Sequence, residues 1–290
     1  MVSPSGKYIF SGHESFPCRT LWLKKGYDFL VAGNSFNAPE AVVTLGVGKN
    51  MVSAIRFWLK SFGISKNDEV SSLGNYLFDN EYGKDKYLED LATLWILHYK
   101  LVSSGEAVLY WMLFCGLQRE RSQFTREQAM SYVRLKMAEL GKQAMFNENT
   151  VKKDIAVFLQ NYLLPKRPQT NEDFSSLLID LDLIRQNEDG KEYHFNVEGK
   201  RKVPSEVFMY ALVELKERIQ DNTIPYETIQ ECIGLVFCMQ DFETITMLKE
   251  LSKKYAQYMA YSDIAGIRQV QFIKDLNKDK LLDDYYETYI

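Results

Sequence analysis

The sequence predicts a mainly α protein with small β-hairpins, in which helix-turn-helix or winged-helix units precede a C-terminal helical region. Two patterns lead to this fold class. A helix-turn-helix spacing occupies residues 38–59, and a helix–helix–hairpin order follows between residues 125 and 195. The composition, 46% hydrophobic and 26% charged over 290 residues, is that of a folded globular chain.

The chain is expected to divide into three parts. Residues 1–104 form an N-terminal helix-turn-helix (winged-helix-like) DNA-binding domain, residues 105–203 a second winged-helix-like domain, and residues 204–290 an acidic helical region. Residues 1–60 hold 7 Lys and Arg against 3 Asp and Glu, whereas residues 204–290 hold 9 against 15. The basic N-terminal part could therefore bind an anionic partner, although the net charge of the whole chain is −4.

Several classes of protein are excluded. No C-x-x-C pair occurs among the four cysteines, which favours buried, reduced thiols in a cytoplasmic protein. The N-terminus has no apolar signal segment, and no apolar run is long enough to span a membrane. The glycines near Lys49 fit neither a phosphate-binding P-loop nor a dinucleotide fingerprint.

The first helical pair follows an extended, turn-rich segment over residues 8–17. A short helix is expected over residues 19–25, ended by Gly26. Residues 38–45 and 49–59 then form two helices broken by Gly46-Val-Gly48. This is the spacing of a helix-turn-helix unit, although a plain αα-hairpin has the same pattern.

Polar and basic residues mark the second helix of this pair as a recognition helix. They can neutralise phosphates or reach base edges, and the alternative is that they are solvated positions on a core helix. The candidate DNA-binding residues of this part of the chain are Lys24, Lys25, Lys49, Asn50, Ser53, Arg56 and Lys60.

Residues 71–78 are expected to form the strand of a wing, and residues 87–99 and 106–117 two apolar helices. The second unit starts with a helix over residues 125–140, in which Thr125 and Gln128 have capping-box spacing.

Asn147 or Asn149 caps the next helix of this unit, which ends at Asn161. Its exposed positions predict DNA contacts through Asn149, Thr150, Lys152 and Lys153. A β-hairpin over residues 183–195, with Asp189-Gly190 at its tip, completes a winged-helix order. A generic helical domain with an added hairpin is the alternative.

The last third of the chain is predicted to be an all-α cap. Its helices cover residues 204–218, 226–239 and 242–261, and residues 283–289 form a surface segment.

The cluster of His13, Glu14 and Arg19 has the most suggestive chemistry. Imidazole and carboxylate could act as base and acid or hold a divalent metal, and arginine could stabilise developing charge on a phosphodiester. Because Phe10, Phe16 and Pro17 surround the pair, a hydrogen-bonded structural histidine is at least as good an interpretation.

Several motifs together resemble the DUF4007 family of bacterial proteins of unknown function. They are Phe10-Ser-Gly-His-Glu-Ser-Phe-Pro-Cys-Arg19, Trp22-Leu-Lys-Lys-Gly26, Leu45-Gly-Val-Gly-Lys-Asn-Met-Val52, Tyr87-Leu-Glu-Asp90 and Ala265-Gly-Ile-Arg268. The resemblance covers most of the chain.

The resemblance implies a role in DNA phosphorothioation defence, because this family includes a DNA-nicking component of the Ssp system. It also implies, as partners, DNA and the cysteine desulfurase, ATPase and ATP-pyrophosphatase-type sulfur-transfer enzyme of such a system. We therefore expect a nicking endonuclease that uses Mg²⁺ or Mn²⁺, with His13, Glu14 and Arg19 as catalytic residues and its metal ligands unknown. A non-catalytic DNA-binding adaptor and a helix-turn-helix regulator are the alternatives.

Overall fold

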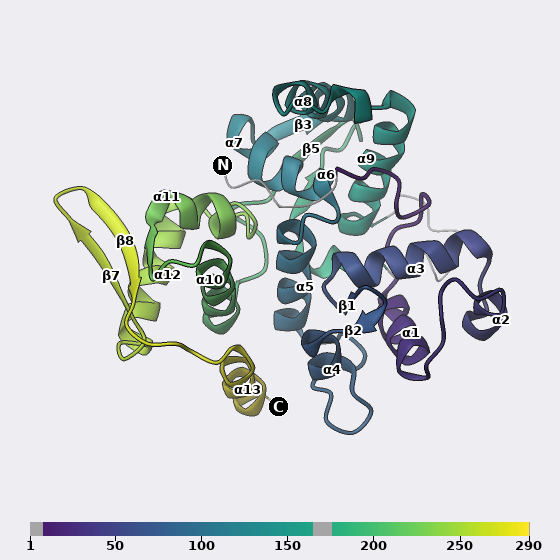
Figure 1. Cartoon of the computed structure of the whole chain (residues 1–290). Coiled ribbons are helices and arrows are strands. Elements are labelled where there is room, and N and C mark those ends of the chain that lie inside the picture. Colours follow the sequence, from purple (N-terminus) through teal and green to yellow (C-terminus); the bar gives the residue numbers. More distant parts are fainter. Residues whose placement is uncertain (1–7, 165–175, 290) are drawn as a thin grey trace. The chain divides into compact units, whose positions relative to one another are not determined.

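The computed structural model describes residues 8–164 and 176–289, which fall into two compact units (Figure 1). The larger unit ends at Arg201 and the smaller begins at Lys202. Both combine helices with small antiparallel sheets, so the predicted mainly α class is confirmed. The predicted boundary between residues 104 and 105 lies inside the larger unit and stays a prediction. Across the described ranges, no helix is both long and apolar enough to cross a membrane.

The larger unit begins with seven elements. They are α1 (Thr20–Val31), α2 (Ala41–Leu45), α3 (Lys49–Ser61), β1 (Ser65–Lys66), β2 (Glu69–Val70), α4 (Ser72–Phe78) and α5 (Leu91–Ser103). The short α2 and the longer α3 confirm the expected helical pair, and Gly46 ends α2 in the left-handed conformation.

Two expectations in this region are wrong. Gly26 does not end α1, which continues to Val31. The role of this glycine is in packing, because its missing side chain lets α1 lie close to Ile55 and Leu59 of α3. The expected wing strand at residues 71–78 is α4. The Ser71 hydroxyl accepts a hydrogen bond from the Gly74 N–H at 3.0 Å, and this N-cap starts a helix.

The second part of the larger unit carries the remaining elements. They are α6 (Val108–Trp111), the π-helical turn η1 (Met112–Leu117), α7 (Gln118–Glu120), β3 (Gln123–Thr125), α8 (Arg126–Glu139), η2 (Gln143–Met145), α9 (Glu148–Tyr162), η4 (Ile179–Leu181), β4 (Ile184–Gln186) and β5 (Glu192–Phe195). The strands form an antiparallel sheet in the order β3-β5-β4.

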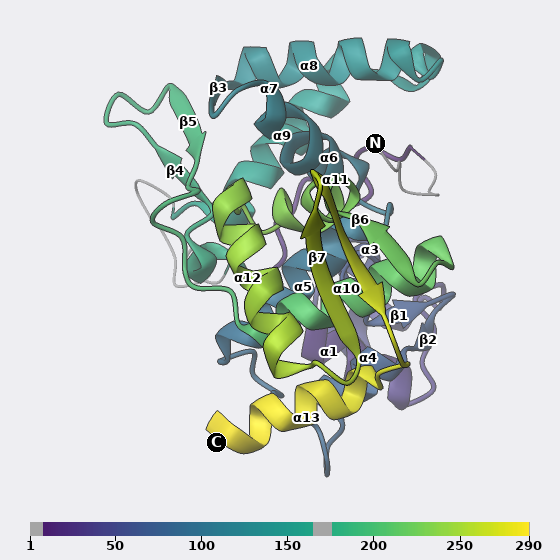
Figure 2. The same ribbon diagram turned by 90° about the vertical axis from the view of Figure 1, so that its left-hand side faces the viewer.

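Local signals predicted this part well. Thr125 and Gln128 form both hydrogen bonds of a capping box at the start of α8. Asn147, and not Asn149, caps α9 by accepting a hydrogen bond from the Thr150 N–H at 3.0 Å. The expected hairpin is β4–β5, which Figure 2 shows projecting from the helices of its unit.

Aromatic rings hold the larger unit together. Trp58 of α3 meets Tyr110 of α6 at 6.2 Å between ring centroids, and Tyr110 meets Phe158 of α9 at 5.3 Å. His98 of α5, fully buried, reaches the Tyr162 hydroxyl with Nδ1 at 2.9 Å. These contacts join four helices in one core, in which His98 is buried and hydrogen-bonded.

The smaller unit is not the expected all-α cap. It contains α10 (Ser205–Ile219), β6 (Thr223–Pro225), α11 (Tyr226–Ile229), η5 (Gln230–Gly234), α12 (Asp241–Lys254), β7 (Met259–Ile264), β8 (Ile267–Phe272) and α13 (Lys278–Tyr289). The strands pair in the order β6-β8-β7, and Figure 2 shows β7 and β8 as a long hairpin.

One further expectation fails in this unit. The third predicted helix, residues 242–261, ends at Lys254, where the chain turns into β7. Residues 283–289, expected as a surface segment, belong to α13, and Asp284, Glu287 and Thr288 are exposed there. That helix buries Leu281, Leu282 and Tyr286, so its apolar positions are part of the core of this unit.

Two glycines of the larger unit predict opposite effects for the same substitution. In Gly26→Ser the new Cβ would lie 2.6 Å from Leu59 Cδ1, so we expect a loss of about 1–3 kcal/mol in the free energy of unfolding. Gly48 is the N-cap of α3 with open space around it, so Gly48→Ser should be neutral or stabilise by a few tenths of a kcal/mol.

Urea unfolding followed by tryptophan fluorescence measures both effects. All four tryptophans, Trp22, Trp58, Trp95 and Trp111, lie in the larger unit, so the signal reports on that unit alone. Equal stability of the two variants would contradict the close packing of α1 on α3.

Candidate nucleic-acid interface

His13 is buried and both its ring nitrogens are engaged. Its ring stacks on Trp58 with centroids 5.7 Å apart and an interplanar angle of 10°. Nδ1 accepts a hydrogen bond from the Ser15 N–H at 3.1 Å, while Nε2 lies 3.3 Å from Asp154 Oδ1. The tautomer with its proton on Nε2 satisfies both contacts.

Two buried polar residues of α9 hold the N-terminal segment, an arrangement that we call the α9 anchor. Asp154 accepts the Ser11 N–H with both carboxylate oxygens, at 3.0 and 2.9 Å. Two turns further along α9, the side-chain oxygen of Asn161 accepts the Cys18 N–H at 2.9 Å. Burial raises the pKa of the Cys18 thiol well above its usual range, so this thiol stays protonated and packs as an apolar group.

The three expected catalytic residues do not converge. Glu14 is exposed, next to the buried His13, and its backbone is left-handed (φ 49°). Arg19 lies over the Trp22 ring, 5.3 Å from its centroid. The catalytic role of these residues stays a prediction, and the geometry of His13 is that of a residue that positions the N-terminal segment.

The expected metal does not fit this cluster. His13 uses one nitrogen on Ser15 and the other on Asp154, and Asp154 uses both oxygens on Ser11. Elsewhere in residues 8–164 and 176–289, no three His, Cys, Asp or Glu side chains are grouped so that they could share an ion.

The predicted residues of α3 meet, but they are largely neutralised. Ser53, Arg56 and Lys60 line one pocket of about 420 Å³ together with Asp68. Arg56 binds Asp68 through two nitrogens, with Nε 2.8 Å from Oδ1, and Lys60 pairs with Glu106 at 2.7 Å. Their charge is therefore already compensated within the chain.

The other N-terminal candidates differ in what they contact. Lys24 pairs with Asp28 at 2.5 Å and bonds Asn80, and Lys25 donates to the Leu45 carbonyl at 2.9 Å. Lys49 and Asn50 are exposed at the start of α3, and Lys49 has no carboxylate partner in the described part of the chain.

The predicted residues of α9 lie on its first two turns. Asn149, Lys152 and Lys153 are exposed, and the Thr150 hydroxyl donates to Asn147 Oδ1 at 3.2 Å. Within the ranges that the structure describes, neither Lys152 nor Lys153 forms an ion pair. The positive charges of these two lysines are therefore available to a negatively charged partner.

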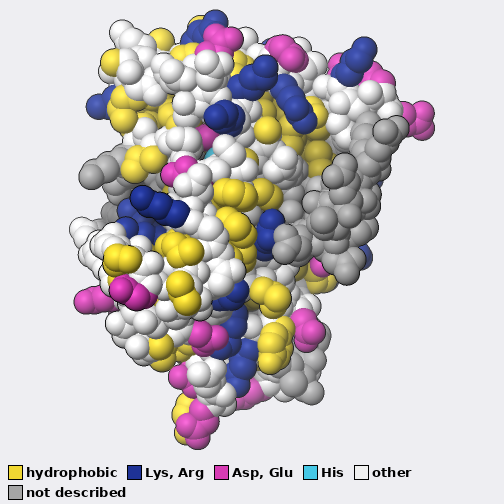
Figure 3. All heavy atoms as spheres, turned by 90° about the vertical axis from the view of Figure 1, so that its right-hand side faces the viewer, with side chains coloured by type: hydrophobic (Ala, Val, Ile, Leu, Met, Phe, Trp, Pro, Cys, Tyr) yellow, Lys and Arg dark blue, Asp and Glu magenta, His cyan; other side chains and the backbone are white. Residues whose placement is uncertain are grey.

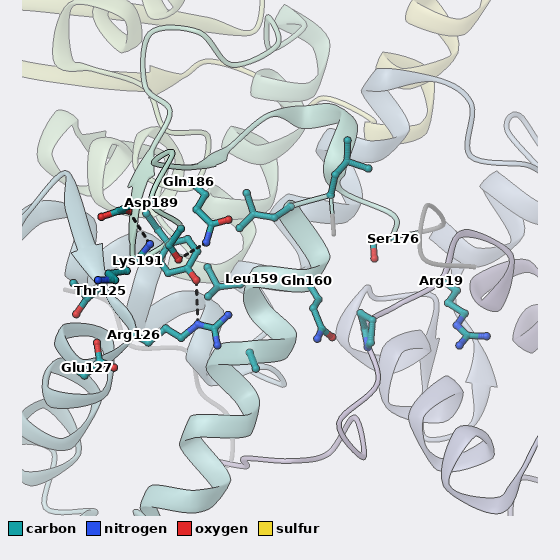
Figure 4. Close-up of a pocket in the computed structure, with 16 residues that line it drawn as sticks. Arg19, Thr125, Arg126, Glu127, Leu159, Gln160, Ser176, Gln186, Asp189 and Lys191 are labelled. Atoms are coloured by element: carbon teal, nitrogen blue, oxygen red, sulfur yellow. Dashed lines mark hydrogen bonds between the residues drawn. The ribbon is translucent and has the colours of Figure 1, made fainter. Parts of the chain in front are cut away.

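A pocket of about 820 Å³ lies beside the second half of α9, and we call it the α9 pocket (Figure 4). Ala156, Leu159 and Gln160 of α9, with Leu163 just after it, form one wall. The start of α8 and the β4–β5 hairpin form a second wall, and Pro17 and Arg19 line the opposite side.

Three cations stand around the α9 pocket: Arg19, Arg126 and Lys191. The Arg126 guanidinium donates from Nε to the Tyr193 hydroxyl at 3.1 Å and extends from the α8 side toward α9 (Figure 4). Among the described residues neither Arg126 nor Lys191 forms an ion pair, and Arg19 lies on the far side of α9 from both. With Glu127 and Asp189 also lining the pocket, three positive charges stand against two negative ones.

Of the three cations of this pocket, sequence reasoning identified Arg19 but neither Arg126 nor Lys191. Arg126 follows the recognised cap Thr125, and Lys191 follows the recognised Asp189-Gly190 turn, so both lie next to a correct local prediction. Their proximity to α9 depends on the pairing of β3 with β5, which no short sequence pattern indicates.

Figure 3 shows how charge is distributed on one face of the molecule. Lys and Arg side chains form several separate groups there, with Asp and Glu side chains and apolar patches between them. A partner with regularly spaced charges could bind such a face only through a few local cations.

Comparisons with known proteins agree with this architecture. Two crystal structures of SspB share the fold. A magnesium-bound SspB structure has a TM-score of 0.83 at 24% identity, and a second SspB structure a TM-score of 0.80 at 22% identity. Each comparison covers 97% of this chain and 89% of the other. No functionally curated protein matches the sequence.

The family model confirms the resemblance seen in the motifs. A model described as a protein of unknown function, DUF4007, matches residues 10–286. The chain belongs to the DUF4007 family.

The contacts of His13 predict that it stabilises the fold. His13→Ala removes a buried ring between Trp58 and Asp154, so the free energy of unfolding should fall by about 2–4 kcal/mol. The neighbouring Glu14→Ala, at an exposed position, should change it by less than about 0.5 kcal/mol.

Urea unfolding of both variants tests this prediction. A His13→Ala protein as stable as the parent would refute the structural role and favour the catalytic one.

Proposed function

We propose that this protein is the DNA-binding component of a phosphorothioation-based defence system and that it nicks one strand for sulfur incorporation. Membership of the DUF4007 family supports the proposal, because the sequence resemblance associates this family with such systems. The similarity in fold to SspB over nearly the whole chain is consistent with it.

The order of elements in the larger unit carries the DNA-binding part of the proposal. Residues 108–195 run helix (α6–α7), strand (β3), helix (α8), helix (α9), strand (β4), strand (β5), with sheet order β3-β5-β4. This order supports a winged-helix assignment, in which the helix after the turn enters the major groove and the hairpin flanks it. By this assignment α9 is the recognition helix and β4–β5 the wing.

The charges of this unit fit that assignment. Lys152 and Lys153 project from the first half of α9, and Asn149 can hydrogen-bond to phosphates or bases. The paired cations of α3, by contrast, would have to exchange their carboxylates for phosphates at a cost. We therefore place the main DNA contacts on α9 and give α3 a minor role through Lys49.

The nicking activity rests on the family resemblance. Hydrolysis of a phosphodiester commonly uses Mg²⁺ or Mn²⁺ to stabilise the charged transition state, and one similar SspB structure is described as magnesium-bound. Since His13 and Asp154 are engaged with each other and with the backbone, we assign no reaction step to them.

That same observation favours a second candidate, a non-catalytic DNA-binding adaptor. Such an adaptor would position the sulfur-transfer machinery, which the resemblance identifies as a cysteine desulfurase, an ATPase and an ATP-pyrophosphatase-type enzyme. A regulator would differ from both by preferring one operator with palindromic half-sites.

A supercoiled-plasmid assay separates these candidates. With Mn²⁺ or Mg²⁺ we expect open-circle product, and with EDTA none. A plasmid that shifts on a gel but stays supercoiled under both conditions would reject nicking by this chain and support the adaptor.

The two lysines of α9 predict a measurable salt effect. In Lys152→Ala/Lys153→Ala two phosphate contacts are lost, so the slope of log affinity against log salt should become shallower by about 2. The measurement is fluorescence anisotropy with a duplex at several salt concentrations.

Two exposed lysines of α12, Lys249 and Lys253, provide a matched control. Because α12 begins with Asp241 and Glu243, the Lys249→Ala/Lys253→Ala variant should keep the parent slope. Equal slopes for the two double variants would contradict the assignment of α9.

A further inference from the structure

We propose that the α9 pocket receives a single unpaired nucleotide of the bound DNA strand. The inference deepens the proposed DNA binding and rests on it. It identifies which part of the DNA enters the protein and by which residues it is held.

The size and lining of the pocket fit one nucleotide. Its volume of about 820 Å³ lies in the range of roughly 300–1,000 Å³ in which proteins hold small ligands. Leu163 and the exposed Leu164 offer apolar surface against which a base can pack.

Amide groups in the walls can read the edge of that base. Gln160 is exposed on α9, so its amide can donate and accept at once. The Gln186 amide nitrogen donates to the Gly190 carbonyl at 2.7 Å, which holds the side chain in place and leaves its oxygen as an acceptor.

The charge around the pocket selects a phosphodiester over a polyphosphate. Three cations and two carboxylates leave one net positive charge, which matches the single negative charge of a nucleotide within a strand. A free nucleoside triphosphate would bring several negative charges close to Glu127 and Asp189 and be repelled.

The position of the pocket relates it to the proposed interface. It lies between α9 and the β4–β5 hairpin, where a strand passing along the recognition helix meets the wing. A paired base shows only its edge in a groove, whereas a base turned out of the stack shows its whole face. Turning the base out costs least where it has no pairing partner, so unpaired sites should be preferred.

The test compares two duplexes of equal length and charge. Each contains 2-aminopurine, placed opposite thymine in one duplex and opposite an abasic site in the other. We expect the full-length protein to bind the second duplex about ten-fold more tightly, and 2-aminopurine fluorescence to change on binding as the base enters the pocket.

Two pocket variants and one control assign the preference to this site. In Ala156→Phe an added ring fills the pocket, and in Gln160→Leu an amide is lost, so the affinity ratio should fall toward one. Ala138→Phe makes the same exchange on an exposed turn of α8 that does not line the pocket and should keep the ratio. Thermal unfolding of each variant checks that it is folded. If Ala156→Phe is unfolded, Gln160→Leu, which changes an exposed residue, still tests the pocket.

The outcomes separate this inference from the proposed function. Tight binding of both duplexes with no preference, or a preference that survives in Ala156→Phe and Gln160→Leu, overturns the pocket assignment while DNA binding stands. Loss of the preference in excess deoxyadenosine monophosphate shows a site for free nucleotides and overturns the assignment to a strand. Failure to bind either duplex overturns the proposed function and this inference together.

Discussion

Two buried polar side chains of α9 determine how the larger unit is assembled. Asp154 and Asn161 accept the backbone N–H groups of Ser11 and Cys18, and Asn161 in turn donates to the Tyr110 hydroxyl at 2.5 Å. A buried carboxylate or amide without such partners would cost several kcal/mol, so the N-terminal segment and α9 stabilise each other. Because the segment continues directly into Arg19, the same bonds fix one side of the α9 pocket. The placement of the N-terminal segment and one side of the pocket thus depend on one helix.

The two units repeat one arrangement with different surfaces. The smaller unit runs α10, β6, α11, α12, β7, β8 with sheet order β6-β8-β7, the same order as in residues 108–195. An arginine–tyrosine contact between helix and sheet occurs in both units. In the larger unit Arg126 of α8 lies over the Tyr193 ring of β5, and in the smaller unit Arg268 of β8 lies over the Tyr226 ring of α11 at 4.2 Å. Arg268 also pairs with Glu227 at 3.6 Å, and α12 has Ile245 and Thr246 as its fifth and sixth residues, where α9 has Lys152 and Lys153. The shared architecture therefore does not imply a shared ligand.

Whether a structural feature could be predicted from the sequence depends on how far apart in the chain its interacting residues lie. The cap at Thr125, the turn at Asp189-Gly190 and the helix of residues 148–162 involve neighbours within a few positions, and their patterns predicted them. Strands of three residues, such as β3 and β6, have no period to detect, and each is defined by a partner strand more than forty residues away. The same limit applies to His13. Its type and its neighbour Glu14 suggested catalysis, but its environment is set by Asp154 and Trp58, which only the folded chain brings to it.

The distance along the chain between the anchor's two halves also bears on how the protein is made. Ser11 and Asp154, like Cys18 and Asn161, are separated by 143 positions. At a ribosomal rate of about 5–20 residues per second, the N-terminal segment leaves the ribosome roughly 7–30 seconds before its helix exists. During that interval its backbone N–H groups can hydrogen-bond to water or to a chaperone but not to α9. The polar stretch Ser11-Gly-His-Glu-Ser15 favours hydration of the segment. These residues, synthesised well before α9, are thus among the last of the larger unit to be fixed in place, and its core cannot close until α9 has emerged.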